Sequence, residues 1–347
     1  MQKFLFLLFF LFTICGFSAP ASPLKGQVKS NFLGEEVTQL GKNLDAIFQD
    51  HQGYYWICSN GDGVYRYDGK NLIRFTQRDG LCSDHVYGVQ EDVNHYLWFS
   101  TPQGVCRFNG IIFEDFTSVI QAAPIGQLIK AREGLFFNHF NRICFYDGKT
   151  FTNVVIHPPG YAPPRGDLNR PYSMYSFLID RNGESWFGTQ SEGVCRYGVD
   201  SCFYLTDKKL RGPAVRAMYQ DKHGIYWFGN NGGGLFRYDG ITLRNITDEQ
   251  GLENPEFFKG KFVEDPHSMA RIFALNGDID GNLWIGTIDA GLWKYDGKNL
   301  VQWGQKEGVP GLVINCIYRD RSDRILIICN METICVLQDG RFERLNS

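Results

Sequence analysis

A sequence unit of about 43 residues recurs along the chain, and this repetition constrains the fold more than any other feature. In the clear copies an aspartate is followed by a tryptophan at a fixed offset: Asp50 and Trp56, Asp92 and Trp98, Asp180 and Trp186, Asp221 and Trp227, and Asp278 and Trp284. Two degenerate copies have Leu135 and Leu326 at the tryptophan position. Seven copies therefore fill residues 44–347, and each must bury its faces against its neighbours.

Every unit contains four short apolar or alternating runs separated by turn residues. In the first unit these runs are residues 44–49, 54–58, 64–67 and 72–75. Such runs predict a four-stranded antiparallel meander. Seven meanders with no helical periodicity between them predict an all-β fold, a seven-bladed β-propeller whose blades are four-stranded antiparallel sheets.

A column of small residues supports this architecture. Four residues before the turn aspartate the units have Ala46, Gly88, Ser176, Ala217, Ala274 and Cys316. The innermost strands of a propeller converge on a narrow channel, so small residues are needed there, whereas a sandwich or an open solenoid would not require them. The aspartate itself is interpreted as a hairpin residue that bonds its own backbone, and the tryptophan as a side chain packed between blades.

The most complete copies of the repeat are residues 180–189 and 278–287, which match the pattern D-x-x-G-x-x-W-x-G-T. In each copy a segment similar to G-L-x-R-Y-D-G comes next. This spelling resembles the two-component regulator propeller repeat, found in periplasmic sensor regions of bacterial hybrid histidine kinases. The resemblance extends over nearly the whole mature chain. It implies sensing of a ligand, often carbohydrate-derived, outside the cytoplasm. Kinase-attached members usually add a second propeller, an immunoglobulin-like module and a membrane span, so a stand-alone propeller would pass its signal through a partner such as a membrane sensor kinase.

The N-terminus predicts export. Lys3 precedes an apolar stretch from Phe4 to Ile14, and residues 19–21 form an A-x-A-like cleavage site, so we interpret residues 1–21 as a signal peptide. No later segment approaches the roughly 20 apolar residues of a membrane span. We expect a periplasmic or secreted protein, with a lipid anchor on Cys15 as the alternative. Residues 22–43 form an N-terminal segment in which residues 36–40 could add an outer strand beside the last blade or lie loosely across it.

Charge and cysteine content narrow the possibilities further. A net charge of −3 and a pI near 6.2 give no basic footprint for nucleic acid. Four cysteines share one third-strand position and are interpreted as buried, inert side chains: Cys106, Cys144, Cys195 and Cys335. A two-residue turn at 198–199 would also place Cys195 opposite Cys202, which makes a cross-strand disulfide possible.

Loops on one face of the predicted ring carry the candidate ligand-binding residues. Asp62, Glu192, Asp289 and Glu332 could form an acidic ring that attracts a cation or bonds sugar hydroxyls, or they could simply be solvated. Two long connections, 155–175 and 247–270, mix aromatic residues with cations, which suits sugars or anionic glycans. The first connection contributes the candidates Tyr161, Arg165 and Arg170. The alternative is that its prolines stiffen a surface excursion.

No convincing catalytic site is found. Asp84 and His85 adjoin Ser83 on the same face and are candidate ligand contacts, but nucleophile, base and orienting residue normally come from separate elements. His51 and His223 fall in turns of the opposite face and are interpreted as exposed turn residues.

No metal or cofactor is predicted. A ligand-binding or sensing module is favoured; the alternatives are a protein-interaction scaffold and a metal-dependent, lyase-like enzyme using His139 and Glu192.

Overall fold

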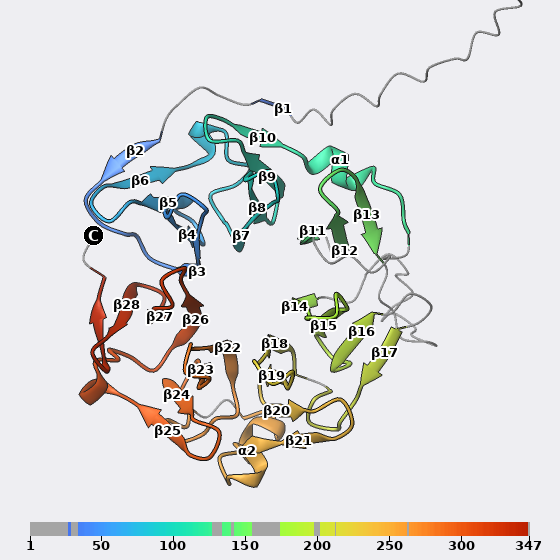
Figure 1. The fold of residues 1–347 in the computed structure, drawn as a ribbon, viewed down its shortest axis with the longest axis vertical. Coiled ribbons are helices and arrows are strands. Elements are labelled where there is room, and N and C mark those ends of the chain that lie inside the picture. The colour runs from blue at the N-terminus through green and yellow to red at the C-terminus, as the bar shows by residue number, and fades with distance from the viewer. Residues whose placement is uncertain are drawn as a thin grey trace, which may run out of the picture.

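The computed structural model describes residues 27–28, 34–126, 134–139, 142–154, 174–197, 202–211, 213–261 and 264–345. Seven antiparallel sheets follow one another around a central channel, and the chain runs around the ring once from its N-terminal to its C-terminal end (Figure 1). The prediction of a seven-bladed propeller is therefore confirmed. The described part of the chain contains no helix long and apolar enough to cross a membrane.

In each complete blade the first strand lies at the channel and the fourth at the rim. The first blade consists of β3 (Leu44–Gln49), β4 (Tyr55–Ser59), β5 (Val64–Tyr67) and β6 (Leu72–Phe75). The second consists of β7 (Gly88–Glu91), β8 (Leu97–Thr101), β9 (Gly104–Phe108) and β10 (Phe113–Asp115). Three strands of the third blade are described: β11 (Leu135–His139), β12 (Arg142–Tyr146) and β13 (Phe151–Val154).

The remaining blades repeat the meander. The fourth has β14 (Met174–Ile179), β15 (Ser185–Thr189), β16 (Val194–Tyr197) and β17 (Cys202–Leu205). The fifth has β18 (Val215–Gln220), β19 (Tyr226–Asn230), β20 (Gly234–Tyr238) and β21 (Leu243–Asn245). The sixth has β22 (Ile272–Gly277), β23 (Leu283–Thr287), β24 (Leu292–Tyr295) and β25 (Leu300–Trp303), and the seventh has β26 (Ile314–Arg319), β27 (Ile325–Cys329), β28 (Thr333–Gln338) and β29 (Arg341–Arg344).

Short helical turns occupy the connections between blades. They are η1 (Gln77–Asp79), α1 (Thr117–Gln121), α2 (Ile246–Glu249), α3 (Pro255–Phe258) and η3 (Gln305–Glu307). Two further strands lie at the rim: β1 (Gln27–Val28) pairs with β10 of the second blade, and β2 (Glu35–Val37) pairs with β6 of the first.

The position of β2 corrects the expectation that this segment lies beside or across the last blade. Val37 pairs with Leu72, and Arg74 of β6 donates to Glu35 with an N–O distance of 2.7 Å. The first blade therefore offers both an unpaired strand edge and a charge partner. Six residues separate β2 from β3, and an extended link of that length reaches roughly 20 Å, enough to cross one blade from rim to channel.

The Asp and Trp columns of the repeat are joined by a hydrogen bond. In the first blade, Asp50 accepts from the backbone N–H groups of Gln52 and Tyr54 at 2.9 Å and from Trp56 Nε1 at 2.7 Å. The other four pairs make the same indole bond, at 2.8 Å for Trp98, 2.9 Å for Trp186, 3.0 Å for Trp227 and 2.9 Å for Trp284. One carboxylate thus fixes both the turn and the buried ring that packs against the next blade.

Side chains and loops close the ring between the seventh and first blades. Tyr55 donates its hydroxyl to Asp320 at 2.7 Å, and the backbone N–H of Leu44 bonds the carbonyl of Met331 at 2.7 Å. Apolar residues of both blades, including Ile57 and Leu326, share one buried cluster. The described meander strands of each blade come from one continuous segment of the chain, so the ring closes only through these contacts between the last blade and the first.

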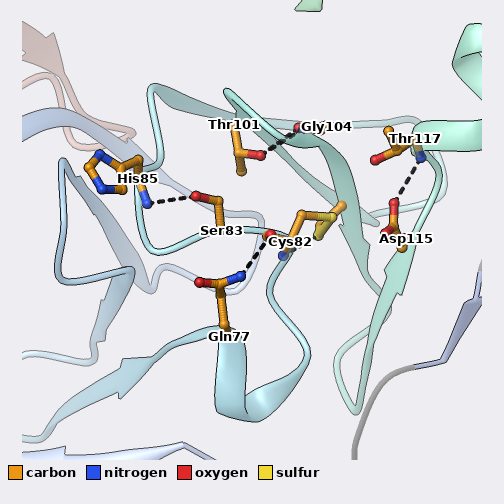
Figure 2. Close-up of a disulfide and its surroundings, with 9 residues drawn as sticks. Gln77, Cys82, Ser83, His85, Thr101, Gly104, Asp115 and Thr117 are labelled. Atoms are coloured by element: carbon orange, nitrogen blue, oxygen red, sulfur yellow. Dashed lines mark hydrogen bonds between the residues drawn. A yellow bond between two sulfur atoms is a disulfide. The ribbon is translucent and has the colours of Figure 1, made fainter.

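The cysteines differ in part from expectation. Cys106 is buried, but it forms a disulfide with Cys82 across a Cα–Cα distance of 5.8 Å, so its interpretation as an inert thiol is wrong (Figure 2). Cys144, Cys195 and Cys335 are buried, as predicted, and take part in no disulfide.

The Cys195–Cys202 disulfide, which the sequence left possible, is not formed: Cys195 takes part in no disulfide, and the strand register separates the two residues. Cys202 pairs with Tyr197, and Cys195 pairs with Tyr204. The hairpin connection therefore spans residues 198–201 rather than two residues.

Candidate functional site

A β-bulge recurs at the start of the innermost strands. Pairing with the second strand skips one residue between Leu44 and Ala46, and the same skip occurs in the fourth, fifth, sixth and seventh blades. In the second blade Tyr87 takes this position, directly before the pair Gly88 and Ser100. The equivalent pairing of the third blade lies outside the described residues. We name these six residues the bulge ring: Asp45, Tyr87, Tyr175, Arg216, Phe273 and Asn315.

The bulge ring lies at one mouth of the channel, beside the column of small residues. It is on the face of the loops between second and third strands, since Leu44 pairs with Ser59 at the end of β4. A bulge re-aims the side chain of the extra residue, and bulges are common next to active sites. Here Tyr87 and Tyr175 remain 55% and 40% exposed despite their size. Aromatic surface at a channel mouth is therefore available to a ligand.

Arg216 lies within the aromatic part of the ring. Its guanidinium carbon is 3.9 Å from the centroid of the Tyr175 ring, in the preceding blade, and 4.9 Å from that of Phe273, in the following blade. Both contacts are within the range of cation–π attraction. The two neighbouring blades thus fix the position of the cation.

The charge of Arg216 is poorly compensated. Burial lowers the pKa of Arg216, an effect that Tyr175 partly offsets. Its Nε atom is buried without a hydrogen-bond partner, and no carboxylate of the described residues forms an ion pair with it. A desolvated cation without an acidic partner favours binding of an anion, and such groups concentrate at functional sites.

On the arc formed by the seventh and first blades, the ring presents oxygen acceptors. Burial raises the pKa of Asp45 to about 6. Asn315 donates through Nδ2 to the carbonyl of Leu44 at 2.8 Å, while its buried Oδ1 has no partner among the described residues. The mouth therefore combines one unpaired cation with acceptors on another arc.

The Asp45→Asn variant tests this view of Asp45. Because the pKa of Asp45 is raised in the folded state, the protonated carboxyl favours folding. Its contribution to the free energy of unfolding is complete below about pH 4 and is lost as pH rises through about 6. The asparagine variant should therefore be more stable than wild type at pH 7, by about 1 kcal/mol after solvent screening, and show no gain at pH 4. Thermal melts at both pH values measure this. An equal change at both would contradict it.

Tyr87, Tyr175 and Arg216 also line a pocket of about 620 Å³. Its wall includes Phe136 and Phe177, whose rings lie 5.6 Å apart. Apolar and aromatic walls with few polar groups are typical of sites for small molecules, and the volume suits a ligand of one to a few sugar rings.

The four acidic loop residues occupy four different blades. Glu192 pairs with Arg211 at 2.6 Å, and Glu332 with Lys42 at 3.4 Å. Asp289 is buried and lies 3.4 Å from buried Arg271. Burial raises the pKa of Asp289 to about 6, although Arg271 opposes the shift.

Asp62, the fourth acidic loop residue, lines a pocket of about 400 Å³ with Tyr65 and Arg74 beneath the N-terminal segment. Its lining residues come from the first blade and the N-terminal segment, and none of the other three carboxylates is among them. The structure thus gives three of the four acids a basic partner.

Asp84 and His85 lie in the connection between the first two blades, which the disulfide anchors at Cys82. The Asp84 carboxylate accepts from the backbone of Gln77 at 2.7 Å. His85 is exposed; its ring contacts the Asn60 side chain, and its backbone N–H, rather than its imidazole, bonds the Ser83 hydroxyl at 3.1 Å (Figure 2). The imidazole is therefore not placed to activate Ser83.

The first long connection, with Tyr161, Arg165 and Arg170, lies outside the described residues, as does the side chain of His139. In the second, Lys259 and Lys261 both pair with Glu256, at 2.5 and 3.1 Å. Phe257 lies 5.6 Å from the Arg271 guanidinium carbon. The cations of this connection are thus engaged locally.

A family model described as two component regulator propeller matches residues 209–232, which cover β18, β19 and the start of the loop that follows β19. The resemblance drawn from the repeat spelling is confirmed by this match. No curated protein sequence matches the chain.

Solved structures share the fold at low identity. The extracellular domain of the putative one component system BT4673 from B. thetaiotaomicron is 18% identical, with a TM-score of 0.61, and the match covers 88% of this chain. The chain spans 40% of the length of that domain. A streptogramin B lyase matches at 12% identity, a TM-score of 0.50 and coverage of 92% and 88% of the two chains. The WD40 propeller of Doa1 matches at 10% identity, a TM-score of 0.54 and coverage of 88% and 98%.

Proposed function

We propose that the protein is an exported ligand-binding propeller of a sensing system, and that its ligand is a small carbohydrate-derived anion bound at the bulge ring. The observation that carries the proposal is Arg216, a desolvated cation that contacts two aromatic rings and has no acidic partner among the described residues.

The chemistry of the ring fits an acidic sugar. A carboxylate accepts two parallel hydrogen bonds from a guanidinium, which gives both affinity and orientation. The exposed rings of Tyr87 and Tyr175 offer flat apolar surface for the ring of a sugar. Asp45 and Asn315 supply oxygen acceptors for hydroxyl groups on another arc. The loops that hold Asp84 and His85 lie on this face and would contact the distal units of a longer glycan.

The likeness to the extracellular domain of BT4673 supports a place in such a system. Another structure of that protein is described as the extracellular domain of a putative hybrid two component system. We propose that the present chain acts in the periplasm or as a secreted protein and transmits ligand binding by contact with a membrane sensor kinase or another protein.

Thermal-shift measurements with matched sugars test the proposal. Oligosaccharides of a hexuronic acid should raise the melting temperature by mass action, whereas neutral oligosaccharides of the same linkage should do so much less. Arg216→Gln should remove the difference. Arg237→Gln is the matched control, since Arg237 lies in β20 of the same blade and pairs with Asp239 at 3.5 Å. No shift with any sugar would overturn the proposal and favour the protein-scaffold alternative.

A further inference from the structure

Three metal-ligand side chains converge on the face opposite the bulge ring. His51 lies in the turn between β3 and β4, Glu91 ends β7, and His95 lies in the turn between β7 and β8. Their ligand atoms all lie within 4.8 Å of one another. Glu91 Oε1 contacts Nδ1 of both imidazoles, at 3.2 Å in the case of His95, and the two rings stack at 3.9 Å. We propose that these residues form a zinc site.

The donor set and its spacing suit Zn²⁺. Two imidazoles and one carboxylate are ligands of zinc sites, with bonds of about 2.0–2.2 Å that leave the fourth position open. Ligand atoms of a tetrahedral ion with such bonds lie roughly 3.3 Å apart. Glu91 Oε1 and His95 Nδ1 are already at that separation, and all the ligand atoms lie within 4.8 Å of one another. The stacked imidazoles would have to turn out of their stack for both to bind one ion. A hard cation such as Mg²⁺ prefers oxygen ligands and would be a poor match.

The carboxylate is held in place from behind. Glu91 is only 7% exposed at its side chain, and its second oxygen, Oε2, lies 3.4 Å from the guanidinium of Arg321 in the seventh blade. Outer contacts of this kind orient a ligating group. Arg321 is itself 55% exposed, so water weakens its repulsion of a bound cation. Three consecutive blades thus build the site.

The backbone conformation of His95 is also unusual for the residue type. His95 adopts a φ of 65°, and four other blades place glycine at this turn position: Gly53, Gly183, Gly224 and Gly281. A non-glycine residue in this conformation costs on the order of 1 kcal/mol, and such strain is common at functional sites. The seventh blade has Asp323 at the same position with a φ of 64°, so His95 is one of two described non-glycine residues that take this turn conformation.

A pocket of about 260 Å³ adjoins the two imidazoles. Besides His51 and His95 it is lined by Tyr54, Tyr96 and Arg66, among others. The open position of the ion could therefore be filled by water or by an anionic donor entering this pocket.

Metal titration tests the inference. Chelator-treated, tag-free protein should bind one Zn²⁺ per chain and melt at a higher temperature with zinc but not with Mg²⁺. Co²⁺ should give the visible absorption of a low-coordinate site. His95→Gly restores the turn glycine, so the metal-free variant should be at least as stable as wild type while its zinc affinity falls about 100-fold. His223 lies in the turn of the fifth blade that corresponds to the turn of His51 in the first. The control variant His223→Ala should therefore bind zinc like wild type.

Three results would overturn the inference. They are the absence of zinc binding to wild type, unchanged zinc affinity in His95→Gly, and an equal loss of affinity in His223→Ala. Because the zinc site and the bulge ring are on opposite faces, Arg216→Gln should leave zinc binding intact, so failure of the ligand proposal and failure of the zinc inference can be distinguished.

Discussion

Asp180→Ala is expected to destabilise the fold by about 4 kcal/mol, since it removes the acceptor of two buried side-chain donors and two backbone N–H groups. The carboxylate accepts from Trp186 Nε1 at 2.9 Å and from the hydroxyl of Tyr226 at 2.6 Å. Tyr226 belongs to the next blade, so the bonds join two blades. Chemical denaturation should show a lower midpoint, and the melting temperature should fall by roughly 8 °C.

The pH dependence of Asp180 has a defined sign. Burial alone would raise the pKa of Asp180, but the hydrogen bonds from Tyr226 and Trp186 outweigh it and hold the pKa below its usual value. The ionised carboxylate therefore stabilises the fold above about pH 4, and this contribution is lost as pH falls through the folded-state pKa. Wild type should lose stability on acidification more steeply than Asp180→Ala. The exposed turn residue Asp239 is the control; its alanine variant should change stability little, and an effect equal to that of Asp180→Ala would contradict the account.

Removal of the Cys82–Cys106 disulfide is expected to destabilise the protein by about 3 kcal/mol. The bond closes a loop with a sequence separation of 24, and the chain-entropy relation gives a stabilisation of that size. It ties the connection between the first two blades to β9 (Figure 2). The double variant Cys82→Ala, Cys106→Ala should therefore unfold at lower denaturant concentration and protect the amides of residues 80–87 less from hydrogen exchange.

Reductant provides a second measurement of the same effect. Wild type should shift toward the double variant when reduced, whereas the double variant should not respond. Cys195→Ala is the matched control, because Cys195 is buried and takes part in no disulfide. A wild type that is no more stable than the double variant before reductant is added would contradict the account.

The repeat predicted the blades well because each blade repeats the same physical constraints. The first, third and fourth strands of the first blade have the predicted bounds, and the second is displaced by one residue. The small-residue column was recognisable because packing at the channel permits few residue types. The indole bond was not predicted, since the offset between Asp50 and Trp56 does not show that a carboxylate and an indole meet across a turn.

The bulge ring could not be identified from the repeat alone. Its positions carry Asp, Tyr, Arg, Phe and Asn, so they share no residue type and cannot be told from positions that vary without a function. What marks these positions is that residue type varies at the position directly before the small-residue column. Arg216 before Ala217 is an example. Recognising it requires knowing that the first strand pairs around this residue and that the six described positions converge at the channel mouth.

The disulfide and the histidine cluster were missed for a related reason. Cys82 lies in an irregular connection, where sequence gives no register that would place it against Cys106. His51 and His95 come from turns of adjacent blades, and only the curvature of the ring brings their rings together. The substitution of His95 for glycine was visible in the sequence, but its partner Glu91 was not.

Calorimetric titration of a hexuronic-acid oligosaccharide tests the central claim, that Arg216 at the bulge ring anchors an anionic ligand. Wild type should bind one ligand per chain, Arg216→Gln should bind at least about 30-fold more weakly, and Arg237→Gln should bind within about twofold of wild type. Undiminished affinity in Arg216→Gln, or equal affinity of wild type for the neutral oligosaccharide, would contradict the claim.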